Sequence, residues 1–285
     1  MSGEARSSFE APDAAGAFVV ARADAPGPIV VEIPHAGLVI DAASARFTSL
    51  PPHAASAGAL RADADLGADA IWEGSERRGV TRLVACTHRY VIDLNTDPRP
   101  PPAPPFYEER PPSRPIIRRS AAGVSWREDA LPPEEIDRRI REIFEPYHAA
   151  IDEELARSVA QNGRVLLIAS HTFPDRTRAH ADVVLGTHEG RTLGADVRDA
   201  IAGVLRSAGL SVALERPFPG GFSLARHARP EDGVVAIQIE IARRVLTEGD
   251  ELGALSEVAV RDVGALMTEV VRASSSALGL GIPAR

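Results

Sequence analysis

The sequence predicts an α/β protein of three layers (α/β/α), in which helices cover both faces of a mixed but mainly parallel sheet. Two observations predict this class. Short β-rich runs alternate along the chain with longer segments of helical periodicity. The run at 165–169 is apolar at every position, which is typical of a strand buried between two layers of helices. Ligands of such folds bind at the carboxyl ends of the strands, so a site is expected there.

The first half of the chain predicts three strands and one helix. The expected elements are a strand at 29–33, a helix at 60–78 that Gly79 closes, and strands at 80–85 and 90–94. Residues 97–115 contain nine prolines, which exclude a helix or a central strand. Either a linker or a long proline-rich loop over the site would explain this segment.

The second half alternates strands and helices more regularly. Prolines and acids at 132–135 are typical of a helix N-terminus, and the apolar stripe after them predicts a helix that Pro146 kinks and Gly163 ends. The other expected elements are strands at 165–169, 182–185, 212–214 and 234–241 and helices at 193–207 and 252–278. We expect residues 1–285 to form a single domain, with a flexible start at 1–16.

Charge and composition exclude several classes of function. The net charge of -8 argues against a nucleic-acid-binding surface, which is normally basic. Cys86 is the only cysteine, so neither a disulfide framework nor a thiolate zinc cluster is expected. No apolar run approaches the roughly 20 residues that span a bilayer, and residues 1–16 lack the apolar core of a signal peptide. We therefore expect a soluble cytoplasmic protein without nucleic-acid or membrane partners.

Three polar residues lie at the ends of predicted strands. His35 and His171 each follow a strand, and Glu240 lies near the end of another, on the same face as Gln238. An acid in an apolar strand costs free energy unless it is paired, binds a metal or takes part in a reaction. A structural histidine or a buried ion pair would explain each residue alone. Three such groups at one edge of a sheet favour a functional site.

Two histidines and one carboxylate are a typical ligand set for a catalytic zinc, which keeps one position open for water. Asp63 and Asp65 stand at the start of the predicted helix at 60–78. One interpretation is that they compensate the helix dipole, and the other is that they serve the metal. Residues two apart on a helix point in different directions, so at most one should bind metal directly. The other could orient a ligand.

The segment at 89–95 would, if extended, project Arg89, Asp93 and Asn95 on one side. Arg89 could stabilise an oxyanion or bind a substrate carboxylate in a bidentate manner. A purely structural ion pair between Arg89 and Asp93 is the alternative. The segment therefore offers either substrate contacts or support for the neighbouring strand.

A turn around Gly220 and Gly221 could permit the close approach of a ligand. The basic run that begins at Arg226 could attract an anionic substrate, although a solvated loop explains the same residues. The residues that we expect to contact a small anionic substrate are Asn95, Gly220, Gly221, Arg226 and Gln238.

Eight short motifs between residues 30 and 248 resemble, in order, those of the N-formylglutamate amidohydrolases. They are Ile33-Pro34-His35-Ala36-Gly37, Asp63-Ala64-Asp65, Arg89-Tyr90-Val91-Ile92-Asp93-Leu94-Asn95, Tyr147-His148, Ser170-His171-Thr172, Leu185-Gly186-Thr187, Pro217-Phe218-Pro219-Gly220-Gly221 and Ala236-Ile237-Gln238-Ile239-Glu240. Each motif is short, but eight in the same order are specific.

The resemblance implies a phosphorylase/hydrolase-like fold related to the zinc carboxypeptidases. It implies hydrolysis of a small N-acyl amino acid, above all of N-formylglutamate to formate and glutamate in histidine breakdown. In this family His35 and His171 would bind zinc or another divalent metal, with Asp65 or Asp63 as the third ligand. Glu240 would be the general base, and Arg89 would contact the substrate or the oxyanion.

Two positions depart from the family pattern. Thr96 stands where the family usually has arginine, which leaves another N-acyl amino acid or a peptide-like amide open as the substrate. Ala169 stands where the family commonly has aspartate, two residues before the second histidine. A lost partner of a metal ligand can weaken metal binding by about 10–100-fold. A metal-free family member that binds a small anion is therefore a further alternative.

Overall fold

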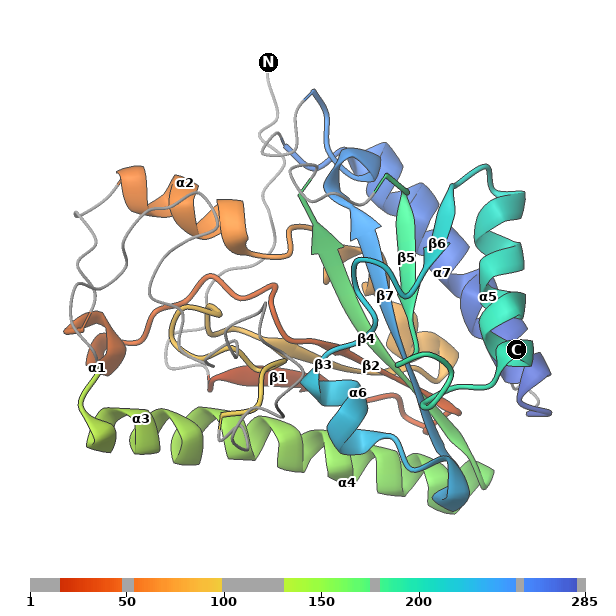
Figure 1. Ribbon diagram of the computed structural model, residues 1–285, viewed down its shortest axis with the longest axis horizontal. Helices are drawn as coiled ribbons and strands as arrows, with labels where there is room; N and C mark the ends of the chain where they lie inside the picture. Colours follow the sequence, from red (N-terminus) through yellow and green to blue (C-terminus); the bar gives the residue numbers. More distant parts are fainter. Residues whose placement is uncertain (1–15, 48–53, 99–130, 175–179, 250–253, 281–285) are drawn as a thin grey trace, which may run out of the picture.

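The computed structural model describes residues 16–47, 54–98, 131–174, 180–249 and 254–280. Seven strands form one sheet in the order β1-β3-β2-β4-β7-β5-β6 (Figure 1). The strands are β1 (Phe18–Ala21), β2 (Ile29–Ile33), β3 (Thr81–Ala85), β4 (Val165–Phe173), β5 (Val183–Gly186), β6 (Val212–Leu214) and β7 (Val234–Ala242). Four neighbouring pairs are parallel, while β1 is antiparallel to β3 and β5 is antiparallel to β7. The predicted mixed, mainly parallel sheet is confirmed.

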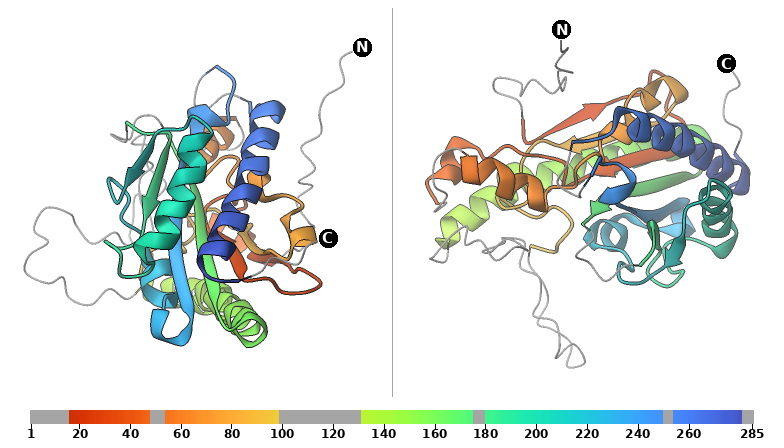
Figure 2. Two further views of the ribbon diagram at one scale, coloured as in Figure 1. Left: turned by 90° about the vertical axis from the view of Figure 1, so that its right-hand side faces the viewer. Right: turned by 90° about the horizontal axis from the view of Figure 1, so that it is seen from above.

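Helices cover both faces of this sheet (Figures 1 and 2). The helix α4 (Glu145–Asn162) packs on one face, and α5 (Ala195–Ser207) and α7 (Glu257–Ala277) pack on the other. Successive side chains of β2 point to opposite faces of the sheet, so Val31 packs towards α5 and α7 while Val30 packs towards α4. The three predicted layers are confirmed.

Shorter elements connect the layers. The remaining helices are α1 (Ala42–Ala45), α2 (Ala54–Asp63), α3 (Pro133–Arg139) and α6 (Phe222–His227), and single turns are η1 (Ala70–Trp72), η2 (Ser75–Arg78), η3 (Ile140–Phe144), η4 (Pro230–Asp232) and η5 (Arg243–Val245). The helix predicted after residue 132 forms as α3 and α4, with the π-helical turn η3 between them just before Pro146. None of the helices in the described parts of the chain is long and apolar enough to cross a membrane.

Two predicted elements are wrong. The helix expected at 60–78 ends at Asp63, because the Asp65 amide donates to the His35 carbonyl instead of continuing the helix, and only the short turns η1 and η2 follow. The strand expected at 90–94 is a series of turns whose backbone carbonyls accept hydrogen bonds from helix side chains rather than from a strand. Most of the proline-rich segment, and residues 1–15, lie outside the described residues.

Candidate active site

Three buried side chains, His35, Asp65 and His171, lie together at the carboxyl ends of the central strands. One ligand atom from each lies within 4.8 Å of the other two. His171 Nδ1 is 2.8 Å from Asp65 Oδ2, and His35 Nδ1 is 3.6 Å from the same oxygen. His35 follows β2, whereas His171 lies within β4, which extends past the predicted strand end to Phe173. Such a set of donors is suited to a divalent metal.

The backbone explains why Asp65, rather than Asp63, joins the two histidines. Asp63 ends α2 and Asp65 follows it, so the pair stands at the C-terminal end of a helix and not at its start. The Asp65 amide donates to the His35 carbonyl at 2.9 Å, which brings its side chain to the site. Asp63 accepts a short hydrogen bond from the Tyr90 hydroxyl instead. Dipole compensation at a helix N-terminus is therefore the wrong interpretation.

The outer nitrogen of His35 contacts a second carboxylate. His35 Nε2 lies 2.8 Å from Asp93 Oδ1, and Arg89 Nη2 donates to Asp93 Oδ2 at 2.8 Å. Metal-binding histidines commonly donate their other ring N–H to a carboxylate in this way. Burial alone would raise the pKa of Asp93, but Arg89 and His35 outweigh it and place that pKa well below its usual range. An ionised Asp93 can therefore fix the orientation of His35.

Glu240 lies next to His171 on the neighbouring strand. The two residues are register partners in the parallel pair of β4 and β7, and both are buried. Gln238 Nε2 donates to Glu240 Oε1 at 2.9 Å, so the two share one face of β7 as the alternation predicted. Burial, together with the charge of Asp65, raises the pKa of Glu240 to about 7 against the opposing effect of His171. A carboxyl group with that pKa can accept and return a proton near neutral pH.

The electrostatics of the cluster favour positive charge at its centre. Burial alone would lower the pKa of His171, but Glu240 and Asp65 outweigh it and raise that pKa to about 9. Burial alone would also raise the pKa of Asp65, yet His171 and His35 hold it well below its usual range. The metal-free site therefore binds protons where a cation would bind.

The predicted substrate residues divide into two groups. Asn95 Nδ2 lies 3.2 Å from His171 Nε2 and 3.3 Å from Gln238 Oε1, so the Asn95 amide lies between a candidate ligand and Gln238. A Cβ at Gly221 would overlap the side-chain amide of Asn95, so this glycine makes room for Asn95. The Arg226 guanidinium, in contrast, lies beside Asp152 on α4, at 3.8 Å.

Gly220 lies in the same turn with φ +119°, a backbone conformation that favours glycine. A Cβ there would meet the ends of the Leu224 and His188 side chains at 2.9 and 3.2 Å. The sequence suggested that a ligand approaches this turn closely. In the structure, the atoms that lie close to both glycines belong to protein side chains.

A further buried acid, which the residue pattern of its strand also indicates, lies on β2. Glu32 is fully buried in the apolar strand β2, and the argument applied to Glu240 applies equally to it. The Tyr147 hydroxyl donates to Glu32 Oε2 at 2.7 Å. In the register of β2 and β4, Glu32 is the partner of Ala169. A carboxylate thus stands on the neighbouring strand beside Ala169, the position where the resemblance to the family implies an aspartate.

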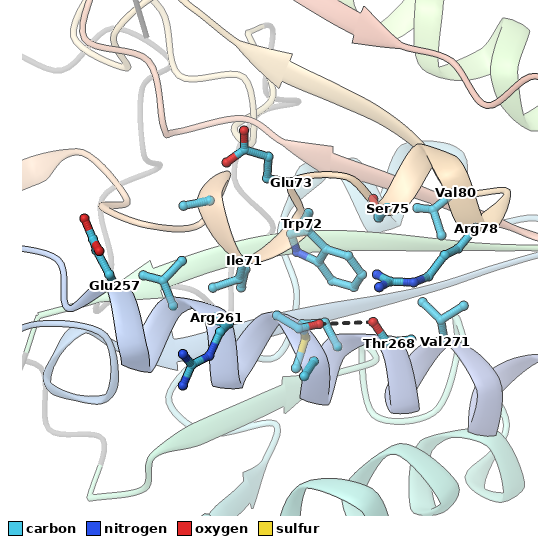
Figure 3. A pocket seen from close by; sticks show the side chains of 15 residues that line it. Ile71, Trp72, Glu73, Ser75, Arg78, Val80, Glu257, Arg261, Thr268 and Val271 are labelled. Atoms are coloured by element: carbon cyan, nitrogen blue, oxygen red, sulfur yellow. Dashed lines mark hydrogen bonds between the residues drawn. The ribbon is translucent and has the colours of Figure 1, made fainter. Parts of the chain in front are cut away.

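Two cavities lie near the site but do not contain Glu240 or His171. One, of about 470 Å³, lies between Trp72 and the helix α7 (Figure 3). Trp72, which lines this cavity, donates from Nε1 to Ser170 Oγ at 2.9 Å and so contacts the residue next to His171. The other, of about 550 Å³, reaches the site only at Asp65.

Comparisons with known proteins show which family this chain is similar to. The family model described as N-formylglutamate amidohydrolase matches residues 27–247. An N-formylglutamate deformylase of Pseudomonas aeruginosa is 29% identical over 76% of this chain and 80% of its own, and one of Pseudomonas putida is 27% identical over 79% and 83%. A crystal structure of N-formylglutamate amidohydrolase from Ralstonia eutropha superposes with a TM-score of 0.76 at 27% identity and covers 93% of this chain and 100% of its own.

Proposed function

The chain belongs to the N-formylglutamate amidohydrolase family, whose members hydrolyse a carbon–nitrogen bond other than a peptide bond, and we propose that its own substrate is N-formylglutamate. Water would cleave the amide bond of this substrate to give formate and glutamate. A small anionic substrate of this kind also fits a histidine-degrading role in the cytoplasm. The lone buried thiol of Cys86 suits a reducing compartment.

The observation that carries the proposal is the buried cluster of His35, Asp65 and His171 with Glu240 directly beside it. Two histidines and one carboxylate are the protein ligands of many catalytic zinc sites. The hydrogen bond between His35 and Asp93 fits the same role, because it orients the imidazole. These residues would hold zinc or another divalent metal, and a metal bound there supplies Lewis acidity to the amide carbonyl and to a water molecule.

Glu240 is suited to move the proton that this hydrolysis requires. Its pKa of about 7 leaves a large share of the carboxylate ionised at neutral pH. The carboxylate would take a proton from the attacking water and return it to the nitrogen of the leaving amino acid, so that the proton balance closes within one turnover. The hydrogen bond from Gln238 to Glu240 Oε1 would keep this carboxylate oriented for both proton transfers.

Arg89 is suited to meet the negative charge that develops on the carbonyl oxygen. Its Nη2 donates to Asp93, its Nη1 lies 3.8 Å from Asp65 Oδ1, and its side chain stays 26% exposed. Burial alone would lower the pKa of Arg89, but Asp93 and Asp65 outweigh it and raise that pKa, so the residue stays charged. A fixed cation at this point would stabilise the oxyanion or bind a substrate carboxylate.

The test is formate release by the purified protein loaded with zinc. We expect turnover of N-formylglutamate, and loss of turnover after treatment with a chelator and its return on adding zinc. Metal analysis of protein purified without chelator should give close to one zinc per chain. The metal-free anion-binding alternative would be favoured if the protein holds less than about a tenth of a zinc per chain and binds N-formylglutamate tightly without turning it over.

Thr96 favours a second candidate, hydrolysis of another N-acyl amino acid or a peptide-like amide. Thr96 is half-buried next to Asn95, at the position where the resemblance to the family implies an arginine that could bind a substrate carboxylate. A panel of N-formyl and N-acetyl derivatives of glutamate, aspartate, glutamine and neutral amino acids separates the two candidates. If a neutral derivative exceeds N-formylglutamate in kcat/KM by tenfold or more, the second candidate is correct.

A further inference from the structure

The segment that carries Asp93 and Asn95 has no regular secondary structure, yet helices fix its backbone from three directions. Arg139 Nη1 donates to the Val91 carbonyl at 2.7 Å, and the Leu94 carbonyl lies 3.0 Å from His148 Nε2. The Phe222 amide, at the start of α6, donates to the Asn95 carbonyl at 3.2 Å. These three carbonyls flank Asp93 on both sides. The position of Asp93 against His35 therefore depends on α3, α4 and α6.

The hydrogen bonds around His148 determine its protonation. A carbonyl oxygen only accepts, so His148 Nε2 must carry a proton and donate it to Leu94. Burial, followed by the charges of His227 and Arg226, lowers the pKa of His148 to about 3, so the ring is neutral and its Nδ1 accepts. The donor to that nitrogen is His227 Nε2, at 2.8 Å.

His227 in turn has a carboxylate on its far side. His227 Nδ1 lies 2.9 Å from Asp152 Oδ1, and the hydrogen bond from His227 lowers the pKa of Asp152, which is therefore ionised. Both nitrogens of His227 then donate, one to Asp152 and one to His148. The other charged groups at this end are Arg226 and Arg229, each 3.8 Å from an Asp152 oxygen. Every proton in the series thus has one assigned place.

The two imidazoles are completely buried, so no solvent replaces a lost partner. Their rings stack at 5.1 Å, and His148 also packs against Phe144 and Phe222 at 4.4 and 5.4 Å. A carbonyl left without a donor in such a place costs free energy and tends to move towards another donor. The Leu94 carbonyl can avoid that cost only by displacing its segment, which includes Asp93.

We propose that His148 is a positioning residue for the active site: through the series Asp152–His227–His148, it holds the Leu94 carbonyl and so fixes Asp93 against His35 and Asn95 against His171. The proposal rests on the proposed function in that His35 and His171 are taken as metal ligands. It assigns to the helix α4 a part in catalysis, although no side chain of α4 contacts the candidate ligands in the described hydrogen bonds.

Two variants at one position separate the donor from the packing. His148→Gln keeps an N–H that can reach the Leu94 carbonyl but loses the ring, whereas His148→Phe keeps a ring among Phe144 and Phe222 but loses the donor. If His148 positions the site, kcat and zinc affinity follow the donor. We expect both to fall about 10–100-fold in His148→Phe and to stay within about threefold in His148→Gln. Melting temperatures report separately on packing.

A role in packing alone predicts the opposite order, with His148→Phe the better enzyme and the more stable protein, and that outcome would overturn the proposal. Glu153→Gln is a control on the same helix, because Glu153 is exposed and contacts only Arg22 in the described hydrogen bonds. It should leave kcat, zinc affinity and melting temperature unchanged.

A measurement on the unaltered protein keeps the proposal testable if a variant does not fold. Imidazole ¹⁵N NMR at pH 7 should show His148 protonated only at Nε2, with its Nδ1 accepting a hydrogen bond from His227. A His148 protonated at Nδ1 would overturn the proposal. Because this spectrum and zinc affinity need no substrate, they decide the positioning role even if N-formylglutamate is not hydrolysed, which would refute the proposed function alone.

Discussion

Binding of a divalent metal to the candidate site should release close to one proton at neutral pH. The metal-free site holds that proton on His171, whose pKa Glu240 and Asp65 raise to about 9 against the effect of burial. A histidine must be unprotonated to bind a metal, so the metal and the proton compete for the same ring. The perturbation in this experiment is therefore the pH at which the metal-free protein is titrated with zinc.

The magnitude follows from the pKa of His171. At pH 7 a group with a pKa of about 9 is unprotonated in about one molecule in a hundred, which corresponds to about 2.7 kcal/mol. The apparent affinity for zinc should therefore rise about tenfold for each pH unit between 6 and 8 and level off above about 9. The sign follows because the metal-free state binds more protons than the metal-bound state, so higher pH favours the metal.

Isothermal titration calorimetry in buffers of different ionisation enthalpy measures the number of protons released. Glu240→Gln is the informative comparison, because Glu240 has the largest raising effect on the pKa of His171. We expect the variant to release fewer protons at pH 8 and to show a flatter affinity profile above pH 7. The prediction is refuted if the zinc affinity of the unaltered protein does not change between pH 6 and 8 and less than about 0.3 proton is released.

Three further predictions concern catalysis and stability. Glu240→Gln should reduce kcat by about 10²–10⁴-fold while zinc stays bound, measured by formate release and metal analysis; near-normal kcat would show that Glu240 is not the base. Gly221→Ala should lower kcat/KM by at least about tenfold, because the added Cβ would displace Asn95. The control Gly203→Ala, in an open position of α5, should leave kcat/KM unchanged and stabilise the protein by up to about 1 kcal/mol. Equal effects of the two substitutions on kcat/KM would contradict this prediction. His148 has a folded-state pKa of about 3 and an ordinary value of 6.5, so the unfolded state binds more protons in that window and stability falls as the pH falls. Lowering the pH from 8 to 5.5 should reduce the free energy of unfolding by about 1.4 kcal/mol through His148. Urea unfolding should show this reduction in the unaltered protein but not in His148→Gln. Identical reductions in both proteins would be inconsistent with a buried neutral ring.

The regular elements of the core could be predicted from local patterns. The strand at 165–169 is apolar at every position, and a strand buried on both faces is the simplest structure for such a run. The two failures, at 60–78 and 90–94, lie where the chain forms the site. The first segment leaves its helix where the Asp65 amide donates to the distant His35 carbonyl. The second segment has its carbonyls bound by Arg139 and His148, which are 48 and 54 residues away from their acceptors.

The sequence by itself determined the fold class, and its ordered motifs indicated the family and the identities of His35, His171 and Glu240. Alternation fixes which face of a strand a residue occupies, and the carboxyl ends of parallel strands meet at one edge, so these inferences need no coordinates. Only the tertiary structure decided that Asp65 rather than Asp63 joins the histidines, that Asp93 orients His35, and that His148 supports their segment. The physical reason is that side chains in turns do not follow the regular repeat in direction that helices and strands impose. Their direction therefore depends on contacts with residues distant in the sequence.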